Sequence, residues 1–142
     1  MKTNIKARVD VIIKAPVSSV WEAVTKPEII KKYFFGTDTH TDWHPGSPIR
    51  FTGEWKGKTY EDKGTVLENE PNQLLSYEYW SSLSGIEDKP ENYVTITYHL
   101  QPDGDNTILS VTQENIPDED MKAHSVENWK TVLEGLKKLL EK

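Results

Sequence analysis

The stretch IKARVDVIIKAPVSSVWEAVTKPEIIKKYF, residues 5–34, carries the clearest signals of secondary structure in this chain. In its first part, residues 5–16, apolar side chains occupy alternate positions: Ile5, Ala7, Val9, Val11 and Ile13. This alternation predicts a β-strand with one buried face. Pro16 ends the strand, and proline also suits the first turn of a helix.

The rest of the stretch predicts two short helices. After Pro16, four apolar residues recur at helical spacing: Val17, Val20, Trp21 and Val24. The pair Lys26-Pro27 breaks this pattern, because the residue before a proline avoids helical backbone. A second helix over about residues 27–33 then leads to the aromatic residues at the end of the stretch.

The C-terminal residues 117–142 predict a long amphipathic helix. Five apolar residues form one stripe along it: Trp129, Val132, Leu133, Leu136 and Leu140. Asp118 suits the N-terminal cap of this helix. Gly135 interrupts the stripe, and glycine is unfavourable inside a helix. We therefore expect the helix to approach the sheet closely at Gly135.

Between these ends, further strand signals alternate with turns. They cover residues 37–43, 49–55, 59–68, 74–80, 92–100 and 107–115. Gly64 lies inside one of them and predicts a bulge or a close backbone approach. The predicted fold class is α+β, with residues 1–142 forming one domain. A seven-stranded, curved antiparallel sheet has two short helices after its first strand and the long C-terminal helix over its concave face.

Composition and charge exclude several classes of function. The chain has 17 Lys plus Arg and 23 Asp plus Glu, so its net charge is −6. It lacks the basic surface that binds nucleic acid or an anionic membrane. It has no cysteine, which excludes disulfides and thiolate chemistry. Residues 1–14 contain no long apolar run, and we expect a soluble cytoplasmic protein.

Motifs along the whole chain occur in an order that is typical of one family. They are Ala15-Pro16, Trp21, Phe34-Phe35, Pro45-Gly46, Phe51, the segment 64–68, Pro71, the segment 77–80, His124, Trp129, Leu133 and Leu136. With this set, the chain resembles the SRPBCC (START-like, helix-grip) superfamily. Within it, the chain is most similar to the branch named for the activator of the heat-shock chaperone ATPase. The resemblance implies the helix-grip fold described above, in a superfamily with many different functions.

The stretch GTDTHTDWHPG, residues 36–46, contains a candidate metal site. Asp38, His40, Asp42 and His44 occupy alternate positions, so in a strand they would share one face. Carboxylates and imidazoles are ligands for divalent metals. However, four such positions span ~20 Å along a flat strand, so at most two of them reach one ion. We interpret them as the solvent-exposed face of an edge strand and expect no metal and no cofactor.

The aromatic residues predict a more specific site. In a helix-grip fold, many of them would converge between the sheet and the C-terminal helix, where their polar atoms need partners. We therefore expect a cavity that binds a hydrophobic or aromatic small molecule, without catalysis. The predicted ligand-binding residues are Tyr33, Phe35, Trp43, Phe51, Trp55, Tyr77, Tyr79, Tyr98, His124 and Trp129. The prediction fails if side chains fill the cavity.

Two other functions stay open at this point. The resemblance implies a co-chaperone-like protein interaction module that stimulates a chaperone ATPase in a stress response, and an exposed apolar patch would favour it. A small cyclase- or hydratase-type enzyme would use the same pocket, and an inward charge with a shifted pKa would favour that function. Arg50, Glu61 and Asp62 lie in the middle of predicted strands, so the inward placement of any of them matters. The ligand is not identified, and both a monomer and a homodimer fit the sequence.

Overall fold

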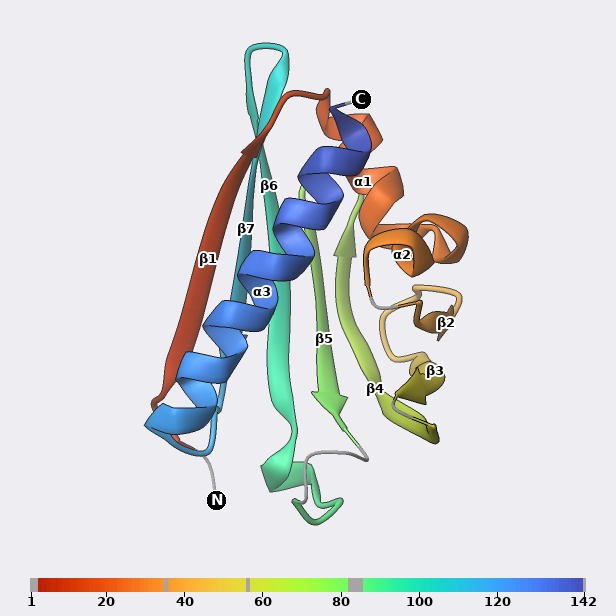
Figure 1. Cartoon of the computed structure of the whole chain (residues 1–142), viewed down its shortest axis with the longest axis vertical. Coiled ribbons are helices and arrows are strands. Elements are labelled where there is room, and N and C mark those ends of the chain that lie inside the picture. The colour runs from red at the N-terminus through yellow and green to blue at the C-terminus, as the bar shows by residue number, and fades with distance from the viewer. Residues whose placement is uncertain (1–2, 35, 56, 82–85, 142) are drawn as a thin grey trace.

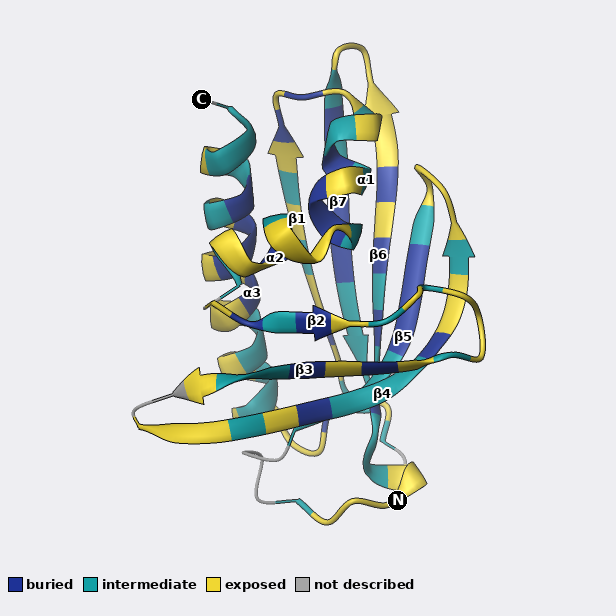
Figure 2. Cartoon of the chain, turned by 90° about the vertical axis from the view of Figure 1, so that its right-hand side faces the viewer, coloured by how far each residue is buried: buried dark blue, intermediate teal, exposed yellow. Residues whose placement is uncertain are grey.

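A computed structural model describes residues 3–34, 36–55, 57–81 and 86–141 of the chain, apart from the side chain of Trp55. Seven strands form one antiparallel sheet in the order β1-β7-β6-β5-β4-β3-β2. They are β1 (Lys6–Ile13), β2 (Asp38–His40), β3 (Pro48–Trp55), β4 (Lys58–Glu70), β5 (Leu74–Trp80), β6 (Val94–Asp103) and β7 (Asn106–Glu114). Buried and exposed residues alternate along β3 and β6, so one face of the sheet is covered (Figure 2). The predicted α+β helix-grip fold is confirmed.

Three α-helices and one short 3-10 helix complete the described chain. They are α1 (Val17–Thr25), α2 (Pro27–Tyr33), the 3-10 helix η1 (Pro90–Asn92) and α3 (Glu119–Leu140). The long helix α3 runs obliquely over the strands β1, β7 and β6 (Figure 1). Its N-terminal cap is Asp118, whose side chain accepts a hydrogen bond of 2.8 Å from the backbone N–H of Met121. Among the described residues, no helix combines the length and the apolarity needed to span a membrane.

Gly135 lies against helix α2 rather than against the sheet, so our prediction for this residue was wrong. A Cβ atom at Gly135 would lie 3.5 Å from the Cβ of Tyr33, which is an ordinary van der Waals contact. The helix-to-helix contact therefore leaves enough room for a methyl group. The approach to the sheet is made by larger residues of the same helix, including the fully buried Leu136.

We expect Gly135→Ala to stabilise the protein by about 0.5–1 kcal/mol, because alanine forms helix more readily and fits this contact. Urea unfolding measures the change directly. Gly104→Ala serves as the control, since Gly104 has a φ of 63° and alanine is strained there. The control should lose stability. A loss of stability in Gly135→Ala as well would show that α2 and α3 do not tolerate the added methyl group.

Strand β4 approaches β5 unusually closely at Gly64. Gly64 pairs with Tyr79 of β5, and a Cβ atom at Gly64 would overlap the backbone oxygen of Glu78. This is the close backbone approach that the sequence predicted. The bulge lies further along, where the register of β4 against β5 shifts between Val66 and Glu68.

The candidate metal stretch forms a shorter strand than predicted. Only Asp38–His40 pairs with β3, and Trp43 has a φ of 65°, so the chain leaves the extended conformation before His44. The four candidate ligands therefore do not share one strand face. Asp38 instead pairs with Lys31 at 3.0 Å, and the side chains of Asp42 and His44 lie 3.4 Å apart. Among the described residues, no group of three or more His, Asp or Glu is arranged to hold a metal ion.

Candidate ligand-binding cavity

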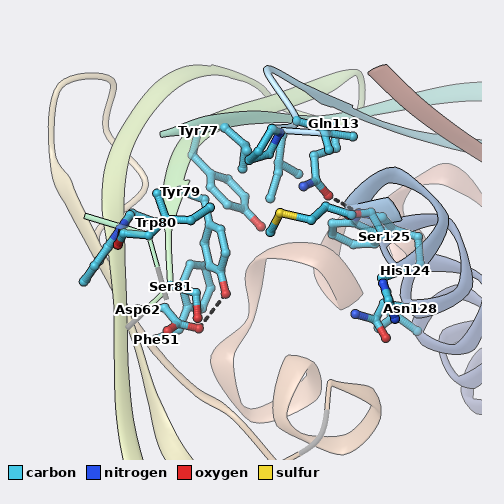
Figure 3. A pocket seen from close by; sticks show the side chains of 18 of the residues that line it. Phe51, Asp62, Tyr77, Tyr79, Trp80, Ser81, Gln113, His124, Ser125 and Asn128 are labelled. Carbon is cyan, nitrogen blue, oxygen red and sulfur yellow. Dashed lines mark hydrogen bonds between the residues drawn. The ribbon is translucent and has the colours of Figure 1, made fainter. Parts of the chain in front are cut away.

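A cavity of about 650 Å³ lies between the sheet and the N-terminal half of α3 (Figure 3). The strands supply one wall, which includes Phe51, Tyr60, Asp62, Tyr77, Tyr79, Trp80, Val94 and Ile96. Helix α3 supplies the facing wall with Met121, His124, Ser125, Asn128, Trp129 and Val132. The remaining lining residues are Phe34, Thr37, Ser81, Ile86, Asn92, Gln113, Ile116 and Pro117. Pro117, His124 and Asn128 are exposed and mark the mouth of the cavity.

A row of aromatic rings runs along the inner end of this cavity. The ring of Trp129 packs edge-on against Phe34 and Tyr98, with ring centroids 6.0 and 5.9 Å apart. Tyr98 packs edge-on against Tyr77, and Phe51 contacts Tyr77 at 5.7 Å. Edge-on and tilted contacts of this kind are the favoured geometries for aromatic pairs. The row therefore links α2, α3 and three strands into one wall.

The tyrosine hydroxyls of this wall are buried and paired with each other. The hydroxyls of Tyr77 and Tyr98 lie 3.3 Å apart, within hydrogen-bond distance. Burial raises the pKa of Tyr98 to about 12 and the pKa of Tyr77 well above its usual value. Both hydroxyls therefore keep their protons at neutral pH, and the pair that they form behind the cavity is neutral.

Asp62 brings a carboxylate to the strand wall. Its side chain is only 6% exposed, and one oxygen accepts a hydrogen bond of 2.5 Å from the Tyr79 hydroxyl (Figure 3). Asp62 pairs with Phe51 across the β3–β4 ladder, so both side chains lie on the concave face. Burial raises the pKa of Tyr79 well above its usual value, and the negative charge of Asp62 raises it further. Tyr79 therefore acts as a hydrogen-bond donor to Asp62.

The helix wall carries two polar groups with defined partners. The indole N–H of Trp129 donates a hydrogen bond of 2.9 Å to the side-chain oxygen of Gln113 in β7. This bond fixes the ring across the gap between helix and sheet. His124 lies one turn before Asn128, and its Nδ1 atom is 3.0 Å from the backbone oxygen of Asp120. His124 thus lies at the mouth, on the opposite side from Asp62 (Figure 3).

The structure brings together five of the ten predicted ligand-binding residues. They are Phe51, Tyr77, Tyr79, His124 and Trp129. Phe35 lies outside the described residues. Trp55 ends β3, and its side chain lies outside the described part of the structure.

Tyr33, Trp43 and Tyr98 do not line this cavity, in contrast to the prediction. They surround a separate void of about 10 Å³, which has room for at most one water molecule. Their polar atoms find partners inside the protein. The Tyr33 hydroxyl donates to the backbone oxygen of Ala23, and the Trp43 indole donates to that of Thr25, both at 2.7 Å. These residues therefore belong to the packed core behind the cavity.

Several lining residues were missed by the sequence reasoning. Met121 and Ser125 are two of them, and they share one face of α3 with the predicted Trp129 because the three residues are spaced by four. Extending the apolar stripe of the helix toward its N-terminus would have found this face. The sequence did not decide whether Asp62 points inward, because the direction of its side chain depends on the register of β4 against β3. Gln113 lies two residues after the buried Val111 in β7, so both side chains are on the same face of the sheet. It lines the cavity near the end of that strand.

Comparisons with known proteins agree with this architecture. Residues 14–141 match the family described as "Activator of Hsp90 ATPase homolog 1-like protein". The protein ChR145 from Cytophaga hutchinsonii is 47% identical in sequence, with 99% of this chain and 97% of that chain covered and a TM-score of 0.85. Protein MLL2253 from Mesorhizobium loti is 25% identical, with 96% and 97% covered and a TM-score of 0.76. The Aha1 dimer from Colwellia psychrerythraea is 22% identical, with 96% of each chain covered and a TM-score of 0.76. A search of curated proteins found no match.

Proposed function

This chain belongs to the Activator of Hsp90 ATPase homolog 1-like family, and we propose that it binds a hydrophobic or aromatic small molecule without transforming it. The observation that carries this proposal is the cavity of about 650 Å³, which the described side chains leave open. Pockets for small molecules have volumes of about 300–1,000 Å³ and are mostly apolar with a few polar groups. The cavity fits this description in its volume and in its aromatic lining.

We expect one molecule of naphthylmethanol, a neutral aromatic probe, to bind per chain. Isothermal titration calorimetry measures both the stoichiometry and the Kd. Ser125→Trp should weaken binding at least about tenfold, because Ser125 faces the cavity from α3 and an indole ring there would occupy the site. Thr131→Trp is the matched control, since Thr131 is exposed on the same helix and does not line the cavity.

The folded state of each variant is checked by thermal unfolding before the titration. Equal binding by Ser125→Trp and the wild type would place the probe outside the cavity and overturn the proposal. No saturable binding of the probe to the wild-type protein would also overturn it.

A co-chaperone-like function is the second candidate, and its support is the description of the family and the similarity to the Aha1 dimer. A chaperone-binding surface should expose a contiguous apolar patch. Among the described residues, the exposed large hydrophobic ones are Ile12 at 53% and Leu67 at 38%. They lie on β1 and β4, which are not neighbours in the sheet. We therefore rank chaperone binding in a stress response below ligand binding.

A cyclase- or hydratase-type enzyme is the third candidate. Asp62 does face the cavity, as this alternative requires, but its neighbour Tyr79 holds its proton because burial raises its pKa. Tyr79 is therefore no base at neutral pH, and the pair has the character of a hydrogen-bonding site.

The proposal also includes a single domain over residues 1–142, a cytoplasmic location and a monomeric or homodimeric state. The absence of cysteine and the net charge of −6 support the location.

A further inference from the structure

One wall of the cavity contains a carboxylate, that of Asp62. Among the lining residues that the structure describes, Asp62 is the only carboxylate, and there is no lysine or arginine. Asp62 is only 6% exposed, so its carboxylate is largely shielded from bulk water. Electrostatic attraction is stronger in such surroundings than in bulk water. The cavity therefore favours a cationic ligand over an anionic one.

Aromatic rings surround this carboxylate. Phe51 lies opposite Asp62 in the β3–β4 ladder, and Tyr79 donates its hydroxyl hydrogen to Asp62. The rings of Phe51 and Tyr79 are 5.7 Å apart and inclined by 62° to each other. A carboxylate beside aromatic rings is the chemistry that binds an ammonium group, by a charge-assisted hydrogen bond and by cation–π attraction.

We infer that the ligand is an aromatic or apolar amine whose protonated nitrogen binds the carboxylate of Asp62. This inference rests on the proposed function, because it concerns the same cavity. The body of the ligand packs against Tyr77 and Trp129, while its ammonium group reaches the corner between Phe51 and Tyr79. The net charge of −6 adds a general attraction for cations at low salt.

The test uses three probes with the same ring and different charge: naphthylmethylamine, naphthylmethanol and naphthoate. Calorimetry at neutral pH gives the three Kd values. Salt at about 0.15 M screens exposed charges beyond roughly 8 Å, so the remaining difference reports on nearby groups. We expect the amine to bind about tenfold more tightly than the alcohol, and naphthoate to bind most weakly.

Asp62→Asn should abolish the advantage of the amine over the alcohol, because it removes the carboxylate and keeps the size of the side chain. Glu61→Gln is the matched control, because it removes one negative charge from the neighbouring residue. Glu61 is exposed and pairs with Arg50 at 3.0 Å, and it does not line the cavity. This control should keep the amine preference. Tyr79→Phe keeps the carboxylate, so it should also prefer the amine.

Each outcome separates the inference from the proposed function. If naphthylmethanol binds but the amine has no advantage, or naphthoate binds best, the inference is overturned and the cavity remains a ligand site. If Asp62→Asn keeps the full preference for the amine, the inference is overturned as well. If no probe binds to the wild-type protein, the proposed function itself fails. Should Asp62→Asn not fold, the wild-type order of the three probes and the Tyr79→Phe result still decide the question.

Discussion

Replacing Gly64 with alanine is expected to lower the free energy of unfolding by about 3 kcal/mol. A Cβ atom at Gly64 would overlap the backbone oxygen of Glu78 in the paired strand. A backbone atom inside a ladder cannot rotate away as a side chain can. The two strands must therefore separate locally, which weakens the hydrogen bonds of the β4–β5 ladder. Urea unfolding measures the loss, and the melting temperature should fall by roughly 10 °C.

Thr65→Ala is the matched control for Gly64→Ala. Thr65 is the next residue of β4 and is half-buried, and its replacement removes atoms rather than adding them. We expect this control to lose no more than about 1 kcal/mol, which is the range of strand preferences. If the two variants were equally stable, the approach of β4 to β5 at Gly64 would have no energetic importance.

Trp129→Ala is expected to lower the free energy of unfolding by about 3–5 kcal/mol. The Trp129 side chain is 6% exposed, and its ring packs edge-on against Phe34 and Tyr98. Truncation removes these contacts and enlarges the cavity. It also leaves the side-chain oxygen of Gln113 without the hydrogen bond from the indole. Naphthylmethanol should bind more weakly, because one aromatic wall of its site is gone.

Trp129→Phe separates the two contributions. It keeps an aromatic ring in the row but removes the indole N–H, so we expect a loss of only about 1–2 kcal/mol. Urea unfolding of both variants gives the comparison. Equal losses in Trp129→Ala and Trp129→Phe would mean that the hydrogen bond to Gln113, rather than ring packing, holds α3 against the sheet.

The repetitive parts of the fold could be predicted from the sequence because their periodicity is local. In β6, Val94, Ile96 and Tyr98 are buried at every second position, as the alternation indicated. The stretch after α2 shows where this reasoning fails. Its Asp and His residues also occupy alternate positions, yet the strand ends at His40. The left-handed backbone of Trp43 and the bond from its indole to Thr25 are tertiary features that a period of two does not reveal.

The region of the candidate site could be predicted from the sequence, but not which aromatic residues line the cavity and which lie behind it. The resemblance implied that aromatic residues converge beneath the long helix, and Phe51, Tyr77 and Trp129 do line the cavity. Tyr98 lies one layer deeper, because its ring packs between those of Tyr77 and Trp129. Asp62 could not be assigned, since one residue of register decides whether a side chain points into the cavity or into solvent.

The buried side chains of α3 all lie from Trp129 onward: Trp129, Val132, Leu133 and Leu136. The first half of the same helix contributes partly exposed residues that line the cavity, such as Met121 and Ser125. In one continuous helix, the part before Trp129 lines the cavity without being buried, while Trp129 and Val132 both line the cavity and belong to the core. Substitutions before Trp129 change what the cavity accepts while the core contacts stay intact. This arrangement gives the scaffold evolvability, because the cavity wall formed by the start of α3 can change without loss of the fold.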